Sequence, residues 1–330
     1  MAAVTVLGAG AWGTALAIGL ANSGQAVKLA VRRESQLSAL RRERENQAYL
    51  PGVRFPSQLQ LTEMSSDSIR DADAVVMAIP SGFARQTLMP LASAIPPESL
   101  VISVSKGIEQ DSLQTMSQML AELAPPPDRI AVLAGPGFAP EIARGKPAAL
   151  VAAARSEAIA RRLQTLFAAK PLRVYRSLDV TGVELGGASK NVIAIAAGIC
   201  DGLSLGSGAR AALITRGLAE MMRLAREAGA KQETLSGLAG LGDLVLTSTG
   251  DLSRNRRLGL ALGRGERISP PAEGASIAEG VSNARAIVRL AERHGVEMPI
   301  SSAVYRVLYE ATPPGAMVEE LLSRELKAEF

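Results

Sequence analysis

A lysine and an aspartate in the second half of the chain have surroundings suited to proton transfer. Lys190 lies in the segment SKNVIAI, just after Ala188 and just before an apolar stretch. Burial lowers the pKa of a lysine, so its amine could accept a proton and its ammonium could donate one near neutral pH. Asp243, in GLAGLGDLVLT, has no other charge nearby in the sequence, and we expect it to orient the Lys190 ammonium or a substrate hydroxyl. The competing interpretation is that Lys190 starts a helix and reaches solvent.

Two basic segments suit a phosphorylated ligand. Ser253, Arg254 and Asn255 follow one another in DLSRNRRLG and offer a hydroxyl, a guanidinium and an amide to a phosphate monoester. Lys106, in SVSKGI, follows an apolar strand and precedes a glycine, a position suited to an anion or a nicotinamide amide. The alternatives are a solvated basic helix start for the first segment and a side chain covering a helix face for Lys106.

Two further candidates carry less specific patterns. The loop LAGPGFAPEIARG, residues 133–145, could turn its backbone amides toward a substrate, or it could be a plain surface turn. Glu279, in IAEGVSNA, could bond a cofactor ribose or amide. We predict no metal-binding residues.

The first two dozen residues predict a strand, a glycine turn and a helix that bind a dinucleotide. An apolar run over residues 4–7 meets Gly8, Gly10 and Gly13. In this pattern the first glycine allows the tight turn, the second lets the backbone approach a pyrophosphate, and the third lets the helix pack on the strand. The phosphates would lie on the N-terminal amides of the helix.

The residues after the second predicted strand favour NADP(H). VKLAV ends at Arg32 and Arg33, about 20 residues beyond the glycines, where an NAD-specific site carries an acid. Arginine pairs with a 2′-phosphate, whereas a carboxylate accepts a hydrogen bond from the 2′-hydroxyl, so we expect NADP(H) to be preferred and NAD(H) to be accepted. A solvated arginine pair is the alternative, and Glu34 stands next to it.

The remaining pattern predicts two domains. Strands alternate with helices over residues 1–178, which indicates a doubly wound, mostly parallel Rossmann-type sheet with the carboxyl end of DADAVVMAIP near the cofactor. We expect helices over residues 35–50, 83–94 and 111–124, with YLPGVRFP as a loop. Long helical segments then predict an all-α substrate-binding domain over residues 179–330, in which RISPPAEGAS is the expected flexible connection.

Composition narrows the function classes. Aromatic residues make up only 3% of the chain and the net charge is +4, which argues against nucleic-acid binding and suits small anions. The lone Cys200 fits a reducing, cytoplasmic location and the lone His294 fits a helix C-terminus, so acid–base chemistry falls to lysine or carboxylate. No basic segment precedes the first apolar run, which argues against a signal peptide or membrane insertion. The apolar segment AMVEELLSREL favours a homodimer.

Taken together, these segments resemble the bacterial NAD(P)-dependent glycerol-3-phosphate dehydrogenase family over nearly the whole chain. The resemblance runs in the family's order through GAGAWGTALA, YLPGV, SKGIE, AGPGFAPEIA, GVELGGASKNVIAIAAGICDG, ALITRGLAEM, GLAGLGDLVLTSTGDLSRNRRLG, EGVSNA and GVEMPI. It implies interconversion of sn-glycerol 3-phosphate and dihydroxyacetone phosphate, with a hydride passing to or from nicotinamide.

The resemblance also implies roles for single residues. Lys190 matches the family's proton acceptor, and with Asp243 and Lys106 it forms the expected catalytic group. The matching substrate contacts are Lys106, Gly135, Asp243, Ser253, Arg254 and Asn255. The matching cofactor contacts are Trp12, Arg32, Arg33, Lys106, Ala139, Arg254 and Glu279, in addition to Gly8, Gly10 and Gly13.

Three positions depart from the family's pattern. Ala11 stands where many members have serine or asparagine, Gly137 replaces a serine or threonine, and Pro140 replaces a lysine. The backbone amide of Gly137 can still donate to the substrate, but the hydroxyl contact is gone. One neutral hydrogen bond is worth about 1 kcal/mol, so we expect substrate binding to be weaker by about fivefold.

The sequence thus predicts a cytoplasmic dehydrogenase that makes glycerol 3-phosphate for phospholipid synthesis. One alternative is another two-domain dehydrogenase, of the β-hydroxyacid type, which also has a lysine on its interdomain helix; residues 253–255 argue instead for a phosphorylated substrate. The other alternative is a catalytically silent NADP-sensing protein, which would not need Lys190 or Asp243.

Overall fold

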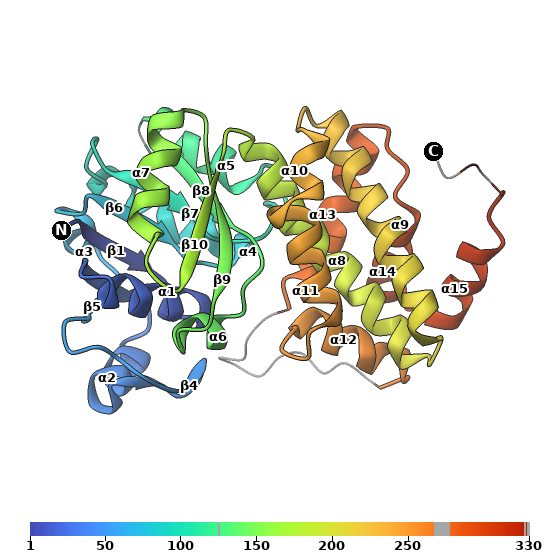
Figure 1. Ribbon diagram of the computed structural model, residues 1–330, viewed down its shortest axis with the longest axis horizontal. Coiled ribbons are helices and arrows are strands. Elements are labelled where there is room, and N and C mark those ends of the chain that lie inside the picture. The colour runs from blue at the N-terminus through green and yellow to red at the C-terminus, as the bar shows by residue number, and fades with distance from the viewer. Residues whose placement is uncertain (125, 267–277, 327, 329–330) are drawn as a thin grey trace.

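The strands of the first half of the chain form one eight-stranded sheet in the order β10-β9-β8-β7-β6-β1-β2-β5. All neighbours are parallel except β8 and β9, which are antiparallel. The computed structural model describes residues 1–124, 126–266, 278–326 and 328 (Figure 1). The strands are β1 (Ala3–Leu7), β2 (Ala26–Val31), β5 (Gln60–Glu63), β6 (Ala74–Met77), β7 (Leu100–Ser103), β8 (Ile130–Ala134), β9 (Ala148–Ala154) and β10 (Leu172–Ser177).

Helices cover both faces of this sheet because successive strand side chains point to opposite sides. Val4 and Val6 pack in the core on one face, while Leu7 and Val75 pack in the core on the other. The first face is covered by α1 (Ala11–Asn22), α2 (Glu34–Glu43), α6 (Ala139–Ala143) and α7 (Glu157–Phe167). The second is covered by α3 (Ser66–Ile69), α4 (Ser81–Leu88) and α5 (Met116–Leu123), with short 3₁₀ turns at Ala92–Ala94 and Pro127–Arg129. The predicted doubly wound, mostly parallel Rossmann-type fold is confirmed.

The second half is helical in the part of it that the structure describes, as predicted. Its helices are α8 (Val180–Gly202), α9 (Gly206–Glu227), α10 (Gln232–Ser236), α11 (Asp243–Thr249), α12 (Arg254–Gly263), α13 (Gly280–Arg293), α14 (Pro299–Tyr309) and α15 (Pro314–Leu322), with a π-helical turn at Leu238–Gly242. The long helix α8 lies among the others (Figure 1). Among the described residues it alone has the length and apolar composition to cross a bilayer, and its whole apolar window is buried inside the protein.

Paired glycines bring α12 onto α8. A Cβ atom on Gly198 would lie 2.0 Å from the carbonyl oxygen of Arg256, and one on Gly259 would lie 2.0 Å from that of Ile195. Neither position can carry a side chain without moving a backbone. The two helices therefore pack in backbone contact, which fixes where the start of α12 meets α8.

The predicted helix over residues 35–50 is wrong in its second half. The helix α2 ends at Glu43 because Arg44 adopts a left-handed conformation, with φ of 51°. The chain then forms a two-stranded antiparallel ribbon, β3 (Glu45–Asn46) and β4 (Leu50–Arg54), so the segment YLPGVRFP is largely a strand rather than a loop. Pro51 and Gly52 are tolerated there because a two-stranded ribbon consists only of edge strands.

Other element boundaries also differ from the prediction. The strand β5 was not predicted. The helix expected over 83–94 is α4, which ends already at Leu88, and the helix expected over 111–124 begins only at Met116. Leu113 has a positive φ of 60°, which a helix cannot accommodate, and Thr115 then caps α5. The segment RISPPAEGAS, predicted as a flexible connection, lies outside the described residues.

Candidate active site

A cleft of about 680 Å³ lies between the carboxyl ends of the central strands and the helical half. Residues from both halves line it, including the segment after β6 that was expected near the cofactor. The lining contains many of the predicted site residues: Gly8, Gly10, Trp12, Gly13, Arg32, Arg33, Lys106, Gly137, Ala139, Lys190, Ser253, Arg254, Asn255 and Glu279. Gly135 and Asp243 are not part of the lining.

The glycine turn has the geometry that a dinucleotide phosphate requires. Gly8 has a φ of +109°, and a Cβ on Gly13 would lie 2.1 Å from the carbonyl oxygen of Gly8. Gly10 faces open space, since a Cβ there would meet nothing within 4 Å. The helix α1 begins after Gly10 with no side-chain cap and no acidic residue in its first turn, so its N-terminal amides keep their affinity for anions. These residues fit a bound pyrophosphate.

The two arginines follow β2, which ends at Val31, and both line the cleft. Arg32 is exposed, whereas the Arg33 guanidinium donates a hydrogen bond of 3.1 Å to the Tyr49 hydroxyl. Arg32 therefore has the greater freedom to meet a ligand phosphate at this end of the cleft.

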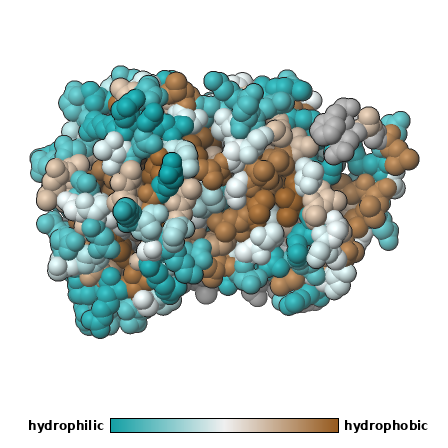
Figure 2. All heavy atoms as spheres, in the orientation of Figure 1, coloured by the Kyte–Doolittle hydropathy of each residue, from teal (hydrophilic) through white to brown (hydrophobic). Residues whose placement is uncertain are grey.

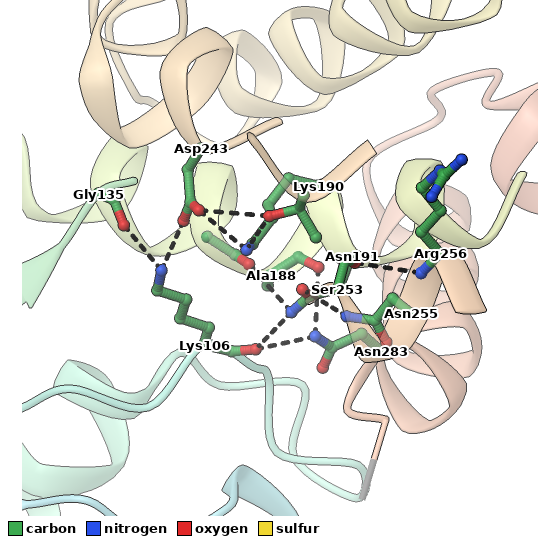
Figure 3. A network of polar contacts seen from close by, with 12 residues as sticks. Lys106, Gly135, Ala188, Lys190, Asn191, Asp243, Ser253, Asn255, Arg256 and Asn283 are labelled. Carbon is green, nitrogen blue, oxygen red and sulfur yellow. Dashed lines mark hydrogen bonds and ion pairs between the residues drawn. The ribbon is translucent and has the colours of Figure 1, made fainter. Parts of the chain in front are cut away.

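Two lysines from different halves of the protein share one buried aspartate (Figure 3). Lys106 Nζ lies 2.6 Å from Asp243 Oδ2 and donates to the Gly135 carbonyl oxygen at 2.9 Å. Lys190 Nζ lies 3.0 Å from Asp243 Oδ1 and donates to Thr247 Oγ1 at 2.6 Å. Both carboxylate oxygens are thus occupied, and Asp243 and Gly135 stand behind the cleft and hold the lysines that face it.

The burial of this cluster tunes its protonation. Burial lowers the pKa of Lys190 to about 8, and the nearby Lys106 charge adds to that effect while Asp243 opposes it. Burial alone would raise the pKa of Asp243, but the charges and hydrogen bonds of Lys106 and Lys190 outweigh it and keep this pKa below its usual value. The result is an ionised aspartate beside a lysine that can gain or lose a proton near neutral pH.

The basic segment 253–255 lies at the start of α12, and all three residues line the cleft. Ser253 is the N-cap, and its hydroxyl accepts a hydrogen bond of 3.1 Å from the Arg256 amide. Asn255 donates to Asn191 Oδ1 at 2.8 Å and accepts from the Gly280 amide at 3.0 Å. The structure therefore gives Ser253 and Asn255 helix-capping and cross-linking contacts in addition to a place in the cleft.

Glu279 lies just before α13 and also lines the cleft. Burial raises its pKa, against the opposing charges of Arg254, Lys190 and Lys106 and a hydrogen bond from the Ser81 amide. Its carboxyl group therefore joins the helical half to the start of α4 in the sheet half.

A neighbouring side chain fills the space beside Gly137. A Cβ on Gly137 would lie 2.7 Å from Ile142 Cδ1 and 3.4 Å from the Trp12 ring. Lys106 Nζ lies 5.7 Å from the centre of that ring. The space that a serine or threonine would need is thus filled by the Ile142 side chain.

Sequence reasoning missed three residues at this site. Thr247 accepts from Lys190, and Asn191 and Asn283 both donate to the main-chain oxygen of Lys106. Thr247 stands four residues after Asp243, so helical spacing would have placed it on the same face. Asn191 directly follows Lys190, but Asn283 lies 177 residues from Lys106, and no local pattern indicates that contact.

The lone cysteine and histidine take no part in the cleft. Cys200 is buried in α8, and burial raises the pKa of its thiol. His294 caps the C-terminus of α13, as expected. The lysines and the carboxylate among the described residues that line the cleft are Lys106, Lys190 and Glu279.

Comparison with known proteins identifies the family. The model of the NAD-dependent glycerol-3-phosphate dehydrogenase N-terminus matches residues 3–160, and that of its C-terminus matches residues 179–319. A glycerol-3-phosphate dehydrogenase (NAD(P)+) of Geobacter sp. (strain M21) is 47% identical over 329 residues, covering 99% of this chain and 98% of its own. That of Thiobacillus denitrificans is 48% identical over 330 residues, covering 99% of each.

A solved structure agrees with these matches. The crystal structure of glycerol-3-phosphate dehydrogenase from Coxiella burnetii has a TM-score of 0.91 and 39% identity, and the match covers 98% of this chain and 99% of that one. The match in sequence and in fold thus extends over both halves of the protein. The chain belongs to the NAD-dependent glycerol-3-phosphate dehydrogenase family.

Proposed function

We propose that this protein reduces dihydroxyacetone phosphate to sn-glycerol 3-phosphate, reversibly, with Lys190 as the general acid and base. The observation that carries the proposal is the buried cluster of Lys190, Asp243 and Lys106 at the wall of a cleft whose other wall is the glycine turn. NADPH or NADH, held at the glycine turn, would supply the hydride to the ketone carbon. The protein must then deliver one proton to the oxygen, and Lys190 has a pKa suited to that task.

Each residue of the cluster has a separate role in this proposal. The Lys190 ammonium donates its proton to the carbonyl oxygen during reduction, and its amine takes the hydroxyl proton back during oxidation. Asp243 keeps the Lys190 side chain oriented through the 3.0 Å contact. Lys106, fixed by Asp243 and the Gly135 carbonyl oxygen, presents a positive charge to the substrate oxygens and to the nicotinamide side.

The phosphate would bind at the start of α12. Arg254 offers a guanidinium there, next to the helix N-terminus, and Ser253 and Asn255 flank it. The amide of Gly137 contributes a backbone donor on the opposite wall. Trp12, Ala139 and Glu279 would contact the cofactor, since all three line the cleft near the glycine turn or the lysines.

We further propose a preference for NADP(H) over NAD(H). Arg32 and Arg33 stand at the end of β2, and neither is a carboxylate that could accept from a ribose 2′-hydroxyl. An arginine there pairs with the 2′-phosphate through charge-assisted hydrogen bonds.

The cellular setting belongs to the same proposal. A cytoplasmic enzyme supplying glycerol 3-phosphate for phospholipid synthesis fits the unpaired, buried Cys200 and the NADP(H) preference. A homodimer is supported by exposed apolar side chains on the helical half, among them Leu241, Val245 and Leu322. Figure 2 shows apolar surface gathered over this half of the molecule. Light scattering on the purified protein tests the dimer, and a monomer would remove that part of the proposal.

A substrate panel tests the reaction. Dihydroxyacetone phosphate, unphosphorylated dihydroxyacetone and a β-keto acid are each assayed with NADPH and with NADH. We expect turnover of the phosphorylated ketone, and a loss on the order of 10⁴ in kcat/KM for dihydroxyacetone, because a site built to bind one group of its substrate rejects an analogue that lacks that group. Equal rates for the two ketones, or faster reduction of the keto acid, would contradict the proposed function.

A further inference from the structure

We propose that Asn283 is a positioning residue that holds the main chain of Lys106, so that the Lys106 ammonium reaches Asp243 and the substrate. This inference rests on the proposed function, in which Lys106 takes part in the reaction. Asn283 itself acts through the Lys106 backbone rather than on the substrate.

The contacts of the Asn283 amide define the role. The side chain is fully buried in the first turn of α13, and its Nδ2 donates to the Lys106 carbonyl oxygen at 2.9 Å and to the Ala188 carbonyl oxygen at 3.2 Å. Lys106 belongs to the loop after β7 in the sheet half, and Ala188 belongs to α8, two residues before Lys190. One amide group therefore ties the loop that carries one lysine to the helix that carries the other (Figure 3).

The oxygen of the Asn283 amide shows that the two hydrogen bonds of its nitrogen have a cost. Asn283 Oδ1 is buried and has no hydrogen-bond partner among the described residues. Turning the amide over would place this oxygen against two carbonyl oxygens, so the two acceptors fix its orientation. Buried polar atoms are almost always satisfied, and an exception calls for an explanation. Here the unpaired oxygen is the consequence of using both N–H groups to hold the loop and α8.

The loop is packed closely against this amide. A Cβ on Gly107 would lie 2.9 Å from Asn283 Oδ1 and 2.2 Å from Ser81 Oγ. Only glycine lets the loop come this near to α13 and α4 together. The first turn of α13 contacts the loop at a second point, where Gln110 Nε2 donates to the Ser282 carbonyl oxygen at 2.9 Å.

A second amide completes the hold on Lys106. Asn191 Nδ2 donates to the same Lys106 oxygen at 3.2 Å, and Asn191 Oδ1 accepts from Asn255, which in turn accepts from the Gly280 amide. The Lys106 carbonyl oxygen thus receives donors from α8 and α13, and α12 is linked to it through one further side chain. Asn283 makes the shorter of the two direct contacts.

The lysine side chain needs this anchor because it is long and flexible. Four rotatable bonds separate the Lys106 backbone from an ammonium group that must lie 2.6 Å from Asp243. If the loop backbone were free to shift, the ammonium would occupy many positions, and holding it in the productive one would cost conformational entropy. Fixing the carbonyl oxygen of the same residue removes that freedom near its source.

Two substitutions test the role against simple packing. Asn283→Asp keeps the shape of the side chain but replaces the N–H donors with an acceptor facing two carbonyl oxygens, and Asn283→Ala removes the group. We expect both variants to lose roughly tenfold in kcat/KM for dihydroxyacetone phosphate. Such a loss lies within the range of interaction energies between residues in contact. The dissociation constant for NADPH should stay within about twofold in both, which also shows that they fold. Wild-type kcat/KM in Asn283→Asp would overturn the proposal.

A double-mutant cycle shows whether Asn283 acts through Lys106. In a Lys106→Met background, Asn283→Ala should cost less than about twofold in kcat/KM, because the ammonium that it positions is already absent. Ser301→Ala is the matched control, since Ser301 is also fully buried in a helix but bonds Glu220 away from the cleft. It should leave kcat/KM unchanged at a similar loss of Tm. An equal cost of Asn283→Ala in both backgrounds would overturn the proposal, whereas an inactive wild type would instead refute the proposed function.

Discussion

The two walls of the cleft are built in different ways. The sheet-side wall contains a stretch of bare backbone, where Gly8, Gly10 and Gly13 remove side chains at points where the chain turns or must stay open. The helical wall is backed by charged side chains that are almost wholly buried, since Lys190 is 5% exposed and Asp243, behind the cleft, is 1% exposed. The available space determines which ligands the sheet-side wall can hold, and the balance of buried charge determines which chemistry the helical wall can support.

The difference predicts how each wall responds to mutation. A change in the sheet-side wall alters fit, and neighbouring side chains can absorb part of it. A change in the helical wall leaves a buried charge without its partner, and such an effect is large and spreads to every group in the cluster. Not every buried carboxylate behaves this way: Glu220, 2% exposed, is held by the amides of Ile300 and Ser301, and burial raises its pKa, whereas the two lysines keep the pKa of Asp243 low.

Replacing the proposed general acid should have the largest effect. Lys190→Ala removes the proton donor from the helical wall and leaves the sheet-side wall intact. We expect kcat for dihydroxyacetone phosphate reduction to fall by about 10²–10⁴, as for other general acid–base groups, with the NADPH dissociation constant nearly unchanged. Steady-state kinetics and fluorescence titration measure the two quantities. Unchanged turnover would remove Lys190 from the mechanism.

Two isosteric substitutions compare the two kinds of buried carboxylate. Asp243→Asn leaves two ammonium groups facing each other, so we expect the free energy of unfolding to drop by about 3–5 kcal/mol and turnover to fall with it. Glu220→Gln loses one amide contact and no ion pair, so it should cost about 1–3 kcal/mol with kcat unchanged. Denaturant titration and steady-state assays check both. Equal losses of turnover in the two variants would contradict the distinction.

The arginines at the end of β2 are the residues of the sheet-side wall that we propose set cofactor choice. Arg32→Asp replaces a guanidinium with a carboxylate at the end of β2, where it would repel a 2′-phosphate and accept from a 2′-hydroxyl. We expect the NADPH/NADH ratio of kcat/KM to fall by about 10- to 100-fold, the worth of a charge-assisted contact. The Arg33→Asp variant serves as a comparison, because Arg33 is already bonded to Tyr49. A ratio that does not change in Arg32→Asp would refute the 2′-phosphate interpretation.

The pH profile should report the helical wall. Reduction needs the Lys190 ammonium, so kcat should fall by about tenfold per pH unit above about 8. Oxidation of glycerol 3-phosphate needs the amine, so its kcat should rise with pH up to about 8 and then level off. Measuring both directions over the same pH range separates this behaviour from general inactivation. Parallel profiles in the two directions would exclude one group acting as both acid and base.

The sequence predicted more of the sheet-side wall than of the contacts within the helical wall. The glycine turn, Arg32 and the alternation of strands and helices are local patterns, and they indicated the sheet-side wall and the fold correctly. The separation of Lys190 from Asp243 by 53 residues is bridged only in the folded protein, so their contact could be proposed from isolated apolar settings but its geometry could not. The Lys106 contact to the same aspartate was not predicted, because it joins different halves of the chain across 137 residues.

The errors have physical causes of the same kind. The helix expected over residues 35–50 carries suitable charged residues, but one left-handed residue, Arg44, ends it and lets the β3–β4 ribbon form. Asn283 carries no local signal, since an asparagine in the first turn of a helix is common and its role depends on the loop that packs on it. Long-range packing, not local preference, decides these positions.

The smallest expected effect tests whether space limits the sheet-side wall. Gly137→Ser would restore the hydroxyl that the family usually carries, but its Cβ would lie 2.7 Å from Ile142 Cδ1. Ile142→Val removes that methyl group. We therefore expect Gly137→Ser alone to give no gain, and the double variant to lower the KM for dihydroxyacetone phosphate by about fivefold, the worth of one neutral hydrogen bond. Ile142→Val alone is the control and should leave KM unchanged. If Gly137→Ser alone lowers KM as much as the double variant does, the Ile142 side chain does not limit this wall, and the glycine reflects only a missing contact.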